Sequence, residues 1–209
     1  MRKRLLSILL LCCMVLTLLP TAAFAAGGVD INETNFPDAT FRQYVKVEFD
    51  EDNNNSLSAD EIAKAKDIHL AGRGISSLAG VEHFTNLEEL DVRHNEELTT
   101  LNLSKNTELK TLMCSNTKLT TLDTSYNTEL VFLECNEVST LTSLNVSQNT
   151  KLKVLRCNDN ALADLNLTNN TALEKLECGG NEFTTLDLSK NTNLKYFGFF
   201  NGKLSSLDL

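Results

Sequence analysis

The chain has 209 residues, 42% of them hydrophobic, which is enough for one domain, or for a domain with a small cap. Aromatic residues make up only 6% and tryptophan is absent, so leucine must supply most of the core. The formal net charge of −9 argues against nucleic acid and anionic membrane surfaces as partners, because both repel an acidic protein.

Residues 1–25 have the pattern of a secretory signal peptide. A basic start (Arg2, Lys3, Arg4) precedes an apolar run over residues 5–19, and Ala23-Phe24-Ala25 forms an A-x-A cleavage site. We expect a secreted or cell-surface protein without membrane insertion after cleavage, and an uncleaved anchor is the alternative. Cleavage removes three positive charges and no negative ones, so the net charge of the mature chain becomes −12.

Residues 26–67 differ from the rest of the chain and predict a small helical cap. The first helix is expected to begin near Asn35-Phe36-Pro37, with Pro37 close to its first position. Phe41, Val45 and Phe49 then recur every four residues on one apolar face, with Tyr44 beside them. A second helix is expected over residues 62–66, preceded by a capping box of Ser58 and Glu61.

The loop between these helices, residues 50–61, resembles the calcium loop of an EF-hand. Carboxylate, amide and hydroxyl oxygens occupy its ligand positions, and calcium prefers six to eight oxygen ligands. The candidate ligands are Asp50, Asp52, Asn54, Ser56, Ser58 and Glu61. Asn55 replaces the usual glycine at the sharp turn, which we expect to weaken calcium binding without abolishing it. The alternative is a polar helix-turn-helix that never binds metal.

A repeat of 21 or 22 residues fills the remainder of the chain. Each copy opens with an L-x-x-L pattern, at Leu87, Leu109, Leu130, Leu152, Leu173 and Leu194. One such unit cannot bury its own leucines, but stacked units can, with one short strand per unit about 4.8 Å from the next. Asparagines that recur at the turns are expected to bond to backbone groups and to form a ladder along the stack.

This pattern resembles the leucine-rich repeats of bacterial surface and secreted proteins, with internalins as the best-known relatives. The resemblance covers roughly residues 75–209. It implies an α/β repeat solenoid, a right-handed coil with a parallel sheet on its concave face, and an EF-hand-like helical cap at the N-terminal end. The expected organisation is a signal peptide (1–25), a cap (26–67) and a repeat domain (68–209). Thr117 and the segment 134–138 depart from the pattern, and we expect a local bulge or twist at the second.

Four cysteines remain after signal cleavage, and all recur at the same repeat position: Cys114, Cys135, Cys157 and Cys178. They are expected to stack inside the core as small apolar side chains. Disulfides between neighbouring units are an alternative, and so is a metal site, although parallel strands do not converge ligands tetrahedrally.

The strand residues that point away from the core are the best candidates for ligand binding. They form two columns across the sheet, and a charged rim surrounds an apolar group in their middle. The candidate residues are Met113, Phe132, Glu134, Val154, Arg156 and Tyr196. We expect a protein or glycan ligand. The alternative is a purely structural module without a specific ligand, which either self-associates through an open edge near residues 204–209 or is part of a larger surface protein. No catalytic motif is present, so an enzyme is not expected.

Overall fold

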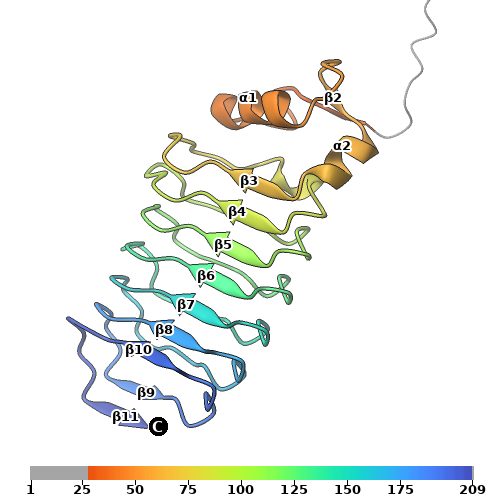
Figure 1. Cartoon of the computed structure of the whole chain (residues 1–209). Helices are drawn as coiled ribbons and strands as arrows, with labels where there is room; N and C mark the ends of the chain where they lie inside the picture. Colours follow the sequence, from red (N-terminus) through yellow and green to blue (C-terminus); the bar gives the residue numbers. More distant parts are fainter. Residues whose placement is uncertain (1–27, 209) are drawn as a thin grey trace, which may run out of the picture.

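The computed structural model describes residues 28–208, which form a helical segment followed by a solenoid (Figure 1). The predicted signal peptide lies outside these residues. Seven parallel strands, one from each turn, form the main sheet in the order β10-β8-β7-β6-β5-β4-β3. Their bounds are β3 Asp67–His69, β4 Glu89–Asp91, β5 Thr111–Met113, β6 Phe132–Glu134, β7 Val154–Arg156, β8 Lys175–Glu177 and β10 Tyr196–Gly198. The predicted repeat solenoid with a parallel sheet is therefore confirmed.

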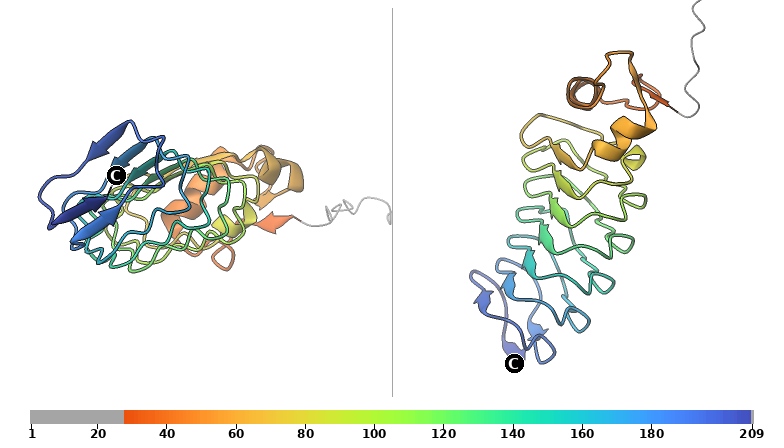
Figure 2. Two further views of the ribbon diagram at one scale, coloured as in Figure 1. Left: turned by 90° about the horizontal axis from the view of Figure 1, so that it is seen from below. Right: turned by 45° about the vertical axis from the view of Figure 1, so that its right-hand side comes forward.

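The turns stack in one direction, with the helical segment at one end and residue 208 at the other (Figure 2). The middle residue of each strand points into the core, and the register sets Leu90 opposite Leu112 and Leu112 opposite Leu133. Behind the main sheet, two further short strands, β9 (Thr185–Asp187) and β11 (Ser206–Asp208), pair in parallel. Within the described part of the repeats the only helical turn is η1 (Val81–His83).

A buried asparagine ladder runs through the turns, as predicted. Its members are Asn106, Asn127, Asn149, Asn170 and Asn191. Each side-chain amide donates to two carbonyl groups of the preceding turn; for Asn127 these are Leu103 at 3.1 Å and Asn106 at 2.8 Å. Carbonyl groups that the bends remove from the sheet thereby gain partners inside the core.

A second asparagine position is broken where the sequence departs from the pattern. Asn95, Asn160 and Asn181 bond to the main chain of their own and neighbouring turns. At the equivalent positions, Thr117 donates its hydroxyl to the Cys114 carbonyl at 2.9 Å, and Val138 is fully buried. The core therefore accepts an apolar side chain at this position.

The bulge predicted near residues 134–138 does not disturb the sheet. Glu134 stays in register with Met113 on one side and with Arg156 on the other. The extra residue is taken up in a turn between Val138 and Leu141, closed by a 2.8 Å hydrogen bond from the Leu141 N–H to the Val138 carbonyl. Because this turn begins after the strand has ended, the additional residue shifts no strand pairing.

Each turn also contains one residue in the left-handed conformation, seven residues after the leucine that opens the unit. These residues have φ between 54° and 65° and are His94, Asn116, Glu137, Asp159, Gly180 and Asn201. Only glycine adopts this conformation without a steric cost, and asparagine and aspartate tolerate it better than other residues. Glu137 is therefore the residue in this series that should be most strained.

The helical cap consists of α1 (Ala39–Glu48) and α2 (Ala59–Lys64). Helix α1 begins later than predicted, because Asp38, not Asn35, caps it by accepting hydrogen bonds from the N–H groups of Thr40 and Phe41. Helix α2 begins at Ala59, three residues before the predicted start. The predicted capping box of Ser58 and Glu61 is confirmed and explains this earlier start.

Aromatic side chains attach the cap to the first turn of the solenoid. Phe49 and Phe36 lie 5.2 and 6.2 Å from Phe84, measured between ring centroids. Gly80 lies at this junction with φ at 105°, and a Cβ atom there would come within 2.4 Å of the Asn35 carbonyl oxygen and of the Phe36 ring. The cap thus covers leucines that an open solenoid end would expose.

The four cysteines lie in the core as unpaired thiols, directly after strands β5 to β8. Burial raises the pKa of Cys135 and of Cys178 to about 12, and it raises the pKa of Cys114 and of Cys157 well above the ordinary value. Their predicted role as small buried side chains is confirmed, and the structure contains no disulfide between them.

Candidate functional site

The strand register arranges the outward side chains of the main sheet into two columns. The leading column holds the first residue of each strand: Asp67, Glu89, Thr111, Phe132, Val154, Lys175 and Tyr196. The trailing column holds the third residue: His69, Asp91, Met113, Glu134, Arg156, Glu177 and Gly198. We call the surface that these two columns form the sheet face. All six residues that the sequence proposed for ligand binding lie on it.

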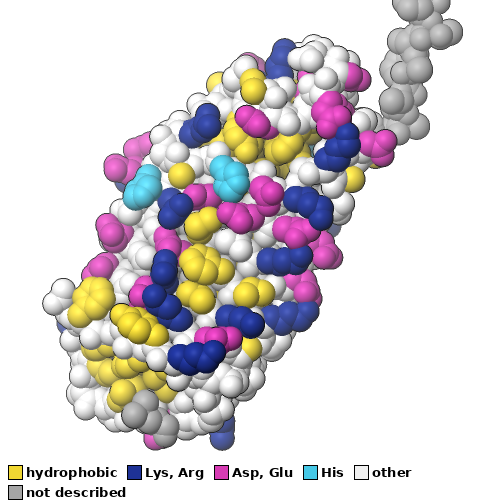
Figure 3. Space-filling model, viewed as in Figure 1, with side chains coloured by type: hydrophobic (Ala, Val, Ile, Leu, Met, Phe, Trp, Pro, Cys, Tyr) yellow, Lys and Arg dark blue, Asp and Glu magenta, His cyan; other side chains and the backbone are white. Residues whose placement is uncertain are grey.

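Apolar side chains occupy the middle of the sheet face. Phe132 and Val154 are neighbours in the leading column, and Met113 lies in the trailing column on β5, the strand next to that of Phe132. All three are half-buried. Figure 3 shows hydrophobic side chains over the middle of the sheet, with acidic side chains between them and the cap. Tyr196, at the far end of the leading column, is 51% exposed.

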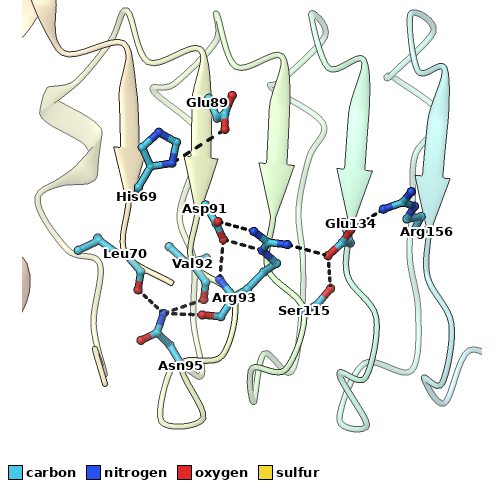
Figure 4. Close-up of polar contacts among 10 residues, drawn as sticks. All are labelled: His69, Leu70, Glu89, Asp91, Val92, Arg93, Asn95, Ser115, Glu134 and Arg156. Carbon is cyan, nitrogen blue, oxygen red and sulfur yellow. Dashed lines mark hydrogen bonds and ion pairs between the residues drawn. The ribbon is translucent and has the colours of Figure 1, made fainter. Parts of the chain in front are cut away.

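A continuous network of ion pairs crosses the same face (Figure 4). Arg93 binds Asp91 through two nitrogens at 2.9 and 2.7 Å, and its Nη1 lies 3.7 Å from Glu134 Oε1. Arg156 Nη1 donates to Glu134 Oε2 at 3.0 Å. The Nε atom of Arg156 lies 3.0 Å from Glu177 Oε2, although that contact lacks hydrogen-bond geometry.

The sequence suggested that Glu134 belongs to an exposed charged rim, but in the structure it lies at the centre of this network. It is only 8% exposed and also accepts a hydrogen bond from the Ser115 hydroxyl at 3.2 Å. Sequence reasoning missed Arg93 and Ser115, which follow their strands by two residues and so lie outside the two columns. Their recurrence at the same position of successive repeats is the signal that could have identified them.

The network keeps its charges paired. Burial by itself would raise the pKa of Asp91, but hydrogen bonds from Arg93 outweigh it and lower that pKa below its ordinary value. The hydrogen bond to Asp91 in turn raises the pKa of Arg93. Both groups therefore remain charged at neutral pH.

Two cations of the sheet face also lie against aromatic rings. The guanidinium carbon of Arg156 lies 5.5 Å from the centre of the Phe132 ring, and the Lys175 ammonium lies 4.6 Å from the centre of the Tyr196 ring. Lys175 Nζ is in addition 2.9 Å from Glu177 Oε1. These contacts hold long side chains in place and so limit the conformational entropy that a ligand would have to remove.

The second candidate site is the loop of the cap. Asp50 accepts hydrogen bonds from the N–H groups of Asn54 and Asn55, at 3.0 and 3.1 Å. Glu61 accepts from the N–H groups of Glu51 and Ser58, both at 2.7 Å, and from the Ser58 hydroxyl. Burial by itself would raise the pKa of Glu61, but the hydrogen bonds from Ser58 and the Glu51 N–H lower it below its ordinary value.

Three of the proposed ligands lie close together in this loop. Carboxylate oxygens of Asp50, Asp52 and Glu61 all lie within 4.8 Å of one another. Oxygens that share one calcium ion at 2.3–2.6 Å lie at most about 5 Å apart, so this spacing fits a common ion. Asn54 lies beside them, with its side-chain amide donating to Asp52 Oδ2 and its Oδ1 accepting from the Ser56 N–H, both at 2.7 Å.

Two further features of the loop bear on its resemblance to an EF-hand. Asn55 has φ at 64°, so asparagine adopts the left-handed conformation for which the usual glycine is suited. Strand β2 (Ser56–Leu57) pairs antiparallel with β1 (Val29–Asp30). The loop therefore pairs with β1, a strand at the start of the same cap segment.

In the rest of the described chain, side chains that could bind a metal ion do not cluster. Among residues 28–208, the loop carboxylates are the one cluster of histidine, cysteine, aspartate or glutamate side chains with metal-binding spacing. A shallow cleft of about 380 Å³ lies between α1 and the first turn, lined by residues that include Tyr44, Val47 and Arg73. The expectation that the protein is not an enzyme stays a prediction. No helix in the described part is long and apolar enough to span a membrane.

No protein-family model matches the sequence, and no curated protein does either. Solved structures do match. The functional domain of InlJ from Listeria monocytogenes, which includes a cysteine ladder, is 26% identical, with a TM-score of 0.50. Internalin F of the same organism is 22% identical with a TM-score of 0.63, and its internalin C2 is 18% identical with a TM-score of 0.61.

The alignments cover most of this chain but different shares of the matched proteins. The aligned region covers 87% of this chain in the first two matches and 86% in the third. It spans 49% of the InlJ domain, 65% of internalin F and 91% of internalin C2. At these identities the similarity to internalins F and C2 concerns the fold alone. The chain therefore has the leucine-rich-repeat fold of the internalins.

Proposed function

We propose that this chain is a binding module that presents its sheet face to a protein ligand. The observation that carries the proposal is the half-buried group of Phe132 and Val154 beside a fixed ion-pair network. Apolar centres with a charged surround are typical of protein interfaces, and arginine and aromatic residues dominate their binding energy. A solenoid also allows these outward residues to vary without a change in the core.

A protein ligand fits this surface better than a glycan. Sugars need many free hydrogen-bonding groups, whereas the polar groups next to Phe132 are already bonded to one another. Binding of an apolar side chain by Phe132 and Val154 leaves those bonds intact and removes apolar area from water, at about 25 cal/mol per Å².

Capture from a cell-surface extract, coupled to a variant of the sheet face, tests this proposal. The immobilised mature protein is compared with Val154→Lys, and with Lys118→Glu as a control in an exposed turn. We expect one protein ligand to be bound by the wild type and by the control, with direct binding of the purified ligand lost in Val154→Lys. Ligands that bind all three proteins equally would refute a role for the sheet face. Glycan-array binding that is lost in the same variant would identify the ligand as a glycan.

We propose further that the cap loop binds calcium, with Asp50, Asp52, Asn54, Ser56, Ser58 and Glu61 as ligands. The spacing of the three carboxylates supports the proposal, since calcium favours several oxygen ligands of this kind. Like-charged carboxylates this close repel one another, and a divalent cation would remove that repulsion. The alternative is a structural role alone, in which Glu61 only completes the capping box of α2.

Calorimetric titration of the mature protein with calcium separates the two roles. Saturable binding is expected in the wild type and in Asp60→Asn, which removes a neighbouring exposed charge, but not in Glu61→Gln. The melting temperature should rise with calcium, because a ligand that binds only the folded state stabilises it. Absence of binding at millimolar calcium would leave the loop as a structural cap.

Export from the cell is proposed on the basis of residues 1–25. The mature protein should be found outside the cytoplasm and begin at Ala26, which N-terminal sequencing of the exported protein determines. Retention of residues 1–25 would indicate an uncleaved anchor.

Self-association is the second candidate function, because Phe200 and Leu207 are 51% and 38% exposed in the last described turn. Light scattering over a hundredfold range of concentration tests it. A molar mass that rises with concentration would favour a self-associating structural module, and a constant monomer mass would oppose it.

A further inference from the structure

The leading column of the sheet face begins with two acidic residues that lack basic partners. The register sets Asp67 directly opposite Glu89 on adjacent strands. Among the described residues, neither carboxylate has a lysine or arginine nitrogen within ion-pair distance, and the nearest basic atom to Glu89 is His69 Nδ1 at 3.9 Å. Like charges that face one another across neighbouring strands are destabilising. A cation from outside the chain would remove this repulsion.

The cations of the same face are, in contrast, already occupied. Arg93 binds Asp91, Arg156 lies between Glu134 and Glu177, and Lys175 is paired with Glu177. An anionic ligand would have to displace one of these carboxylates and would meet the repulsion of the others. Among the described residues of the leading column, negative charge without an ion-pair partner is therefore concentrated at the cap end.

Beyond the acidic pair, the leading column becomes neutral and then apolar. Thr111 follows Glu89, and Phe132 and Val154 come next. With neighbouring strands about 4.8 Å apart, Glu89 lies roughly 10 Å from Phe132 and roughly 14 Å from Val154. An extended peptide advances about 3.3 Å per residue, so these distances correspond to about three and four residues.

We infer that the ligand is an extended protein segment that carries a lysine or arginine three to four residues from a pair of apolar side chains. The basic side chain lies against Asp67 and Glu89, and the apolar pair packs on Phe132 and Val154. Arg156, held against the Phe132 ring by Glu134, forms one wall of the apolar position. This inference rests on the proposed function, because it specifies the partner of the same sheet face.

Selection from a random library of twelve-residue peptides displayed on phage tests the inference. The mature protein is the target, and the Val154→Lys variant removes peptides that bind elsewhere. We expect the selected peptides to share a basic residue three or four positions from two apolar residues. A synthetic peptide of that consensus, labelled with a fluorophore, is then titrated against each variant by anisotropy.

The charge variants give the decisive comparison. Glu89→Gln should weaken the consensus peptide roughly two- to fivefold, as expected for a partly exposed ion pair. Glu89→Lys should reverse the preference, so that a peptide with glutamate in place of the basic residue binds more tightly than the original. Glu97→Gln, the same change in the turn after β4, should leave the affinity unchanged. Circular dichroism confirms that each variant is folded.

Failure of this inference differs from failure of the proposed function. Selected peptides that need Val154 but lack a shared basic residue would overturn the charge order and leave the sheet face as the binding site. A library whose enriched peptides are all removed by the Val154→Lys variant, because they bind it as well as the wild type, would overturn both. A library that yields no enriched peptide would overturn recognition of a short extended segment.

Discussion

Replacement of Asn149 by alanine offers a quantitative test of the asparagine ladder. The Asn149 amide donates to the carbonyl groups of Thr124 at 3.0 Å and Asn127 at 2.8 Å, and its Oδ1 accepts from the Thr124 hydroxyl at 2.8 Å. The side chain is fully buried, so water cannot replace these bonds without entering the core. Alanine would leave two carbonyl groups and one hydroxyl with fewer partners.

A buried polar group without a partner costs about 1–3 kcal/mol. The carbonyl groups of Thr124 and Asn127 each keep one hydrogen bond, from the N–H groups of Asn127 at 3.0 Å and Leu130 at 3.1 Å, so the loss is smaller than the full cost of three unpaired groups. We therefore expect Asn149→Ala to lower the free energy of unfolding by about 2–4 kcal/mol. For a chain of this size the melting temperature should fall by roughly 4–16 °C.

Asn145 provides the matched control, because it lies in the same turn but is exposed and accepts one hydrogen bond from the Ser147 N–H at 3.0 Å. Asn145→Ala should change the free energy of unfolding by less than about 0.5 kcal/mol. Urea denaturation followed by circular dichroism measures both variants. If Asn149→Ala were no more destabilising than Asn145→Ala, the hydrogen bonds of the ladder would not contribute to stability.

Three further predictions concern strain, the cap junction and the buried thiols. Glu137→Gly should raise the free energy of unfolding by about 0.5–1 kcal/mol, since it relieves a residue at φ 55°, and an unchanged urea midpoint would contradict this. Gly80→Ala should destabilise the protein by more than about 2 kcal/mol and increase hydrogen exchange in α1, because its Cβ would overlap Phe36; exchange equal to that of the wild type would show that the junction adapts. The four core thiols should react with a thiol reagent only after unfolding. Burial raises the pKa of Cys135 from 9.0 to about 12, so the protonated thiol contributes its full stability below pH 9. This contribution is lost as the pH rises towards 12, and urea denaturation midpoints recorded between pH 8 and pH 12 should fall accordingly.

Much of the fold follows from the sequence because the spacing of residues within each repeat determines how the repeats pack on one another. A leucine every three residues within a unit, and a unit every 21 or 22 residues, fixes which side chains point inward and which strands are neighbours. The two outward columns, the buried cysteines and the asparagine ladder were predicted for this reason. In the cap loop, Asn55 replaces the usual glycine at the sharp turn, and it adopts the left-handed conformation with φ at 64°.

The errors arose where contacts outside the repeat register decide the outcome. The start of α1 was misplaced because Asp38 caps the helix and also accepts hydrogen bonds from Ser76, a residue of the first turn that no local pattern relates to it. The bulge predicted for residues 134–138 does not form in the sheet, because the additional residue of this unit lies in the turn that follows the strand.

The stack, its direction of repetition and the composition of the outward columns follow from the hydrophobic periodicity of the sequence, because that periodicity leaves one way to bury the leucines. The pairing of the charges in those columns depends instead on the tertiary structure. Glu134 appears in the sequence as one more surface carboxylate, yet Arg93, Ser115 and Arg156 come from three different turns to surround it. The carboxylates of Asp67 and Glu89 are left without such partners, since side-chain reach between turns, and not residue type, determines which charges remain free to bind a ligand.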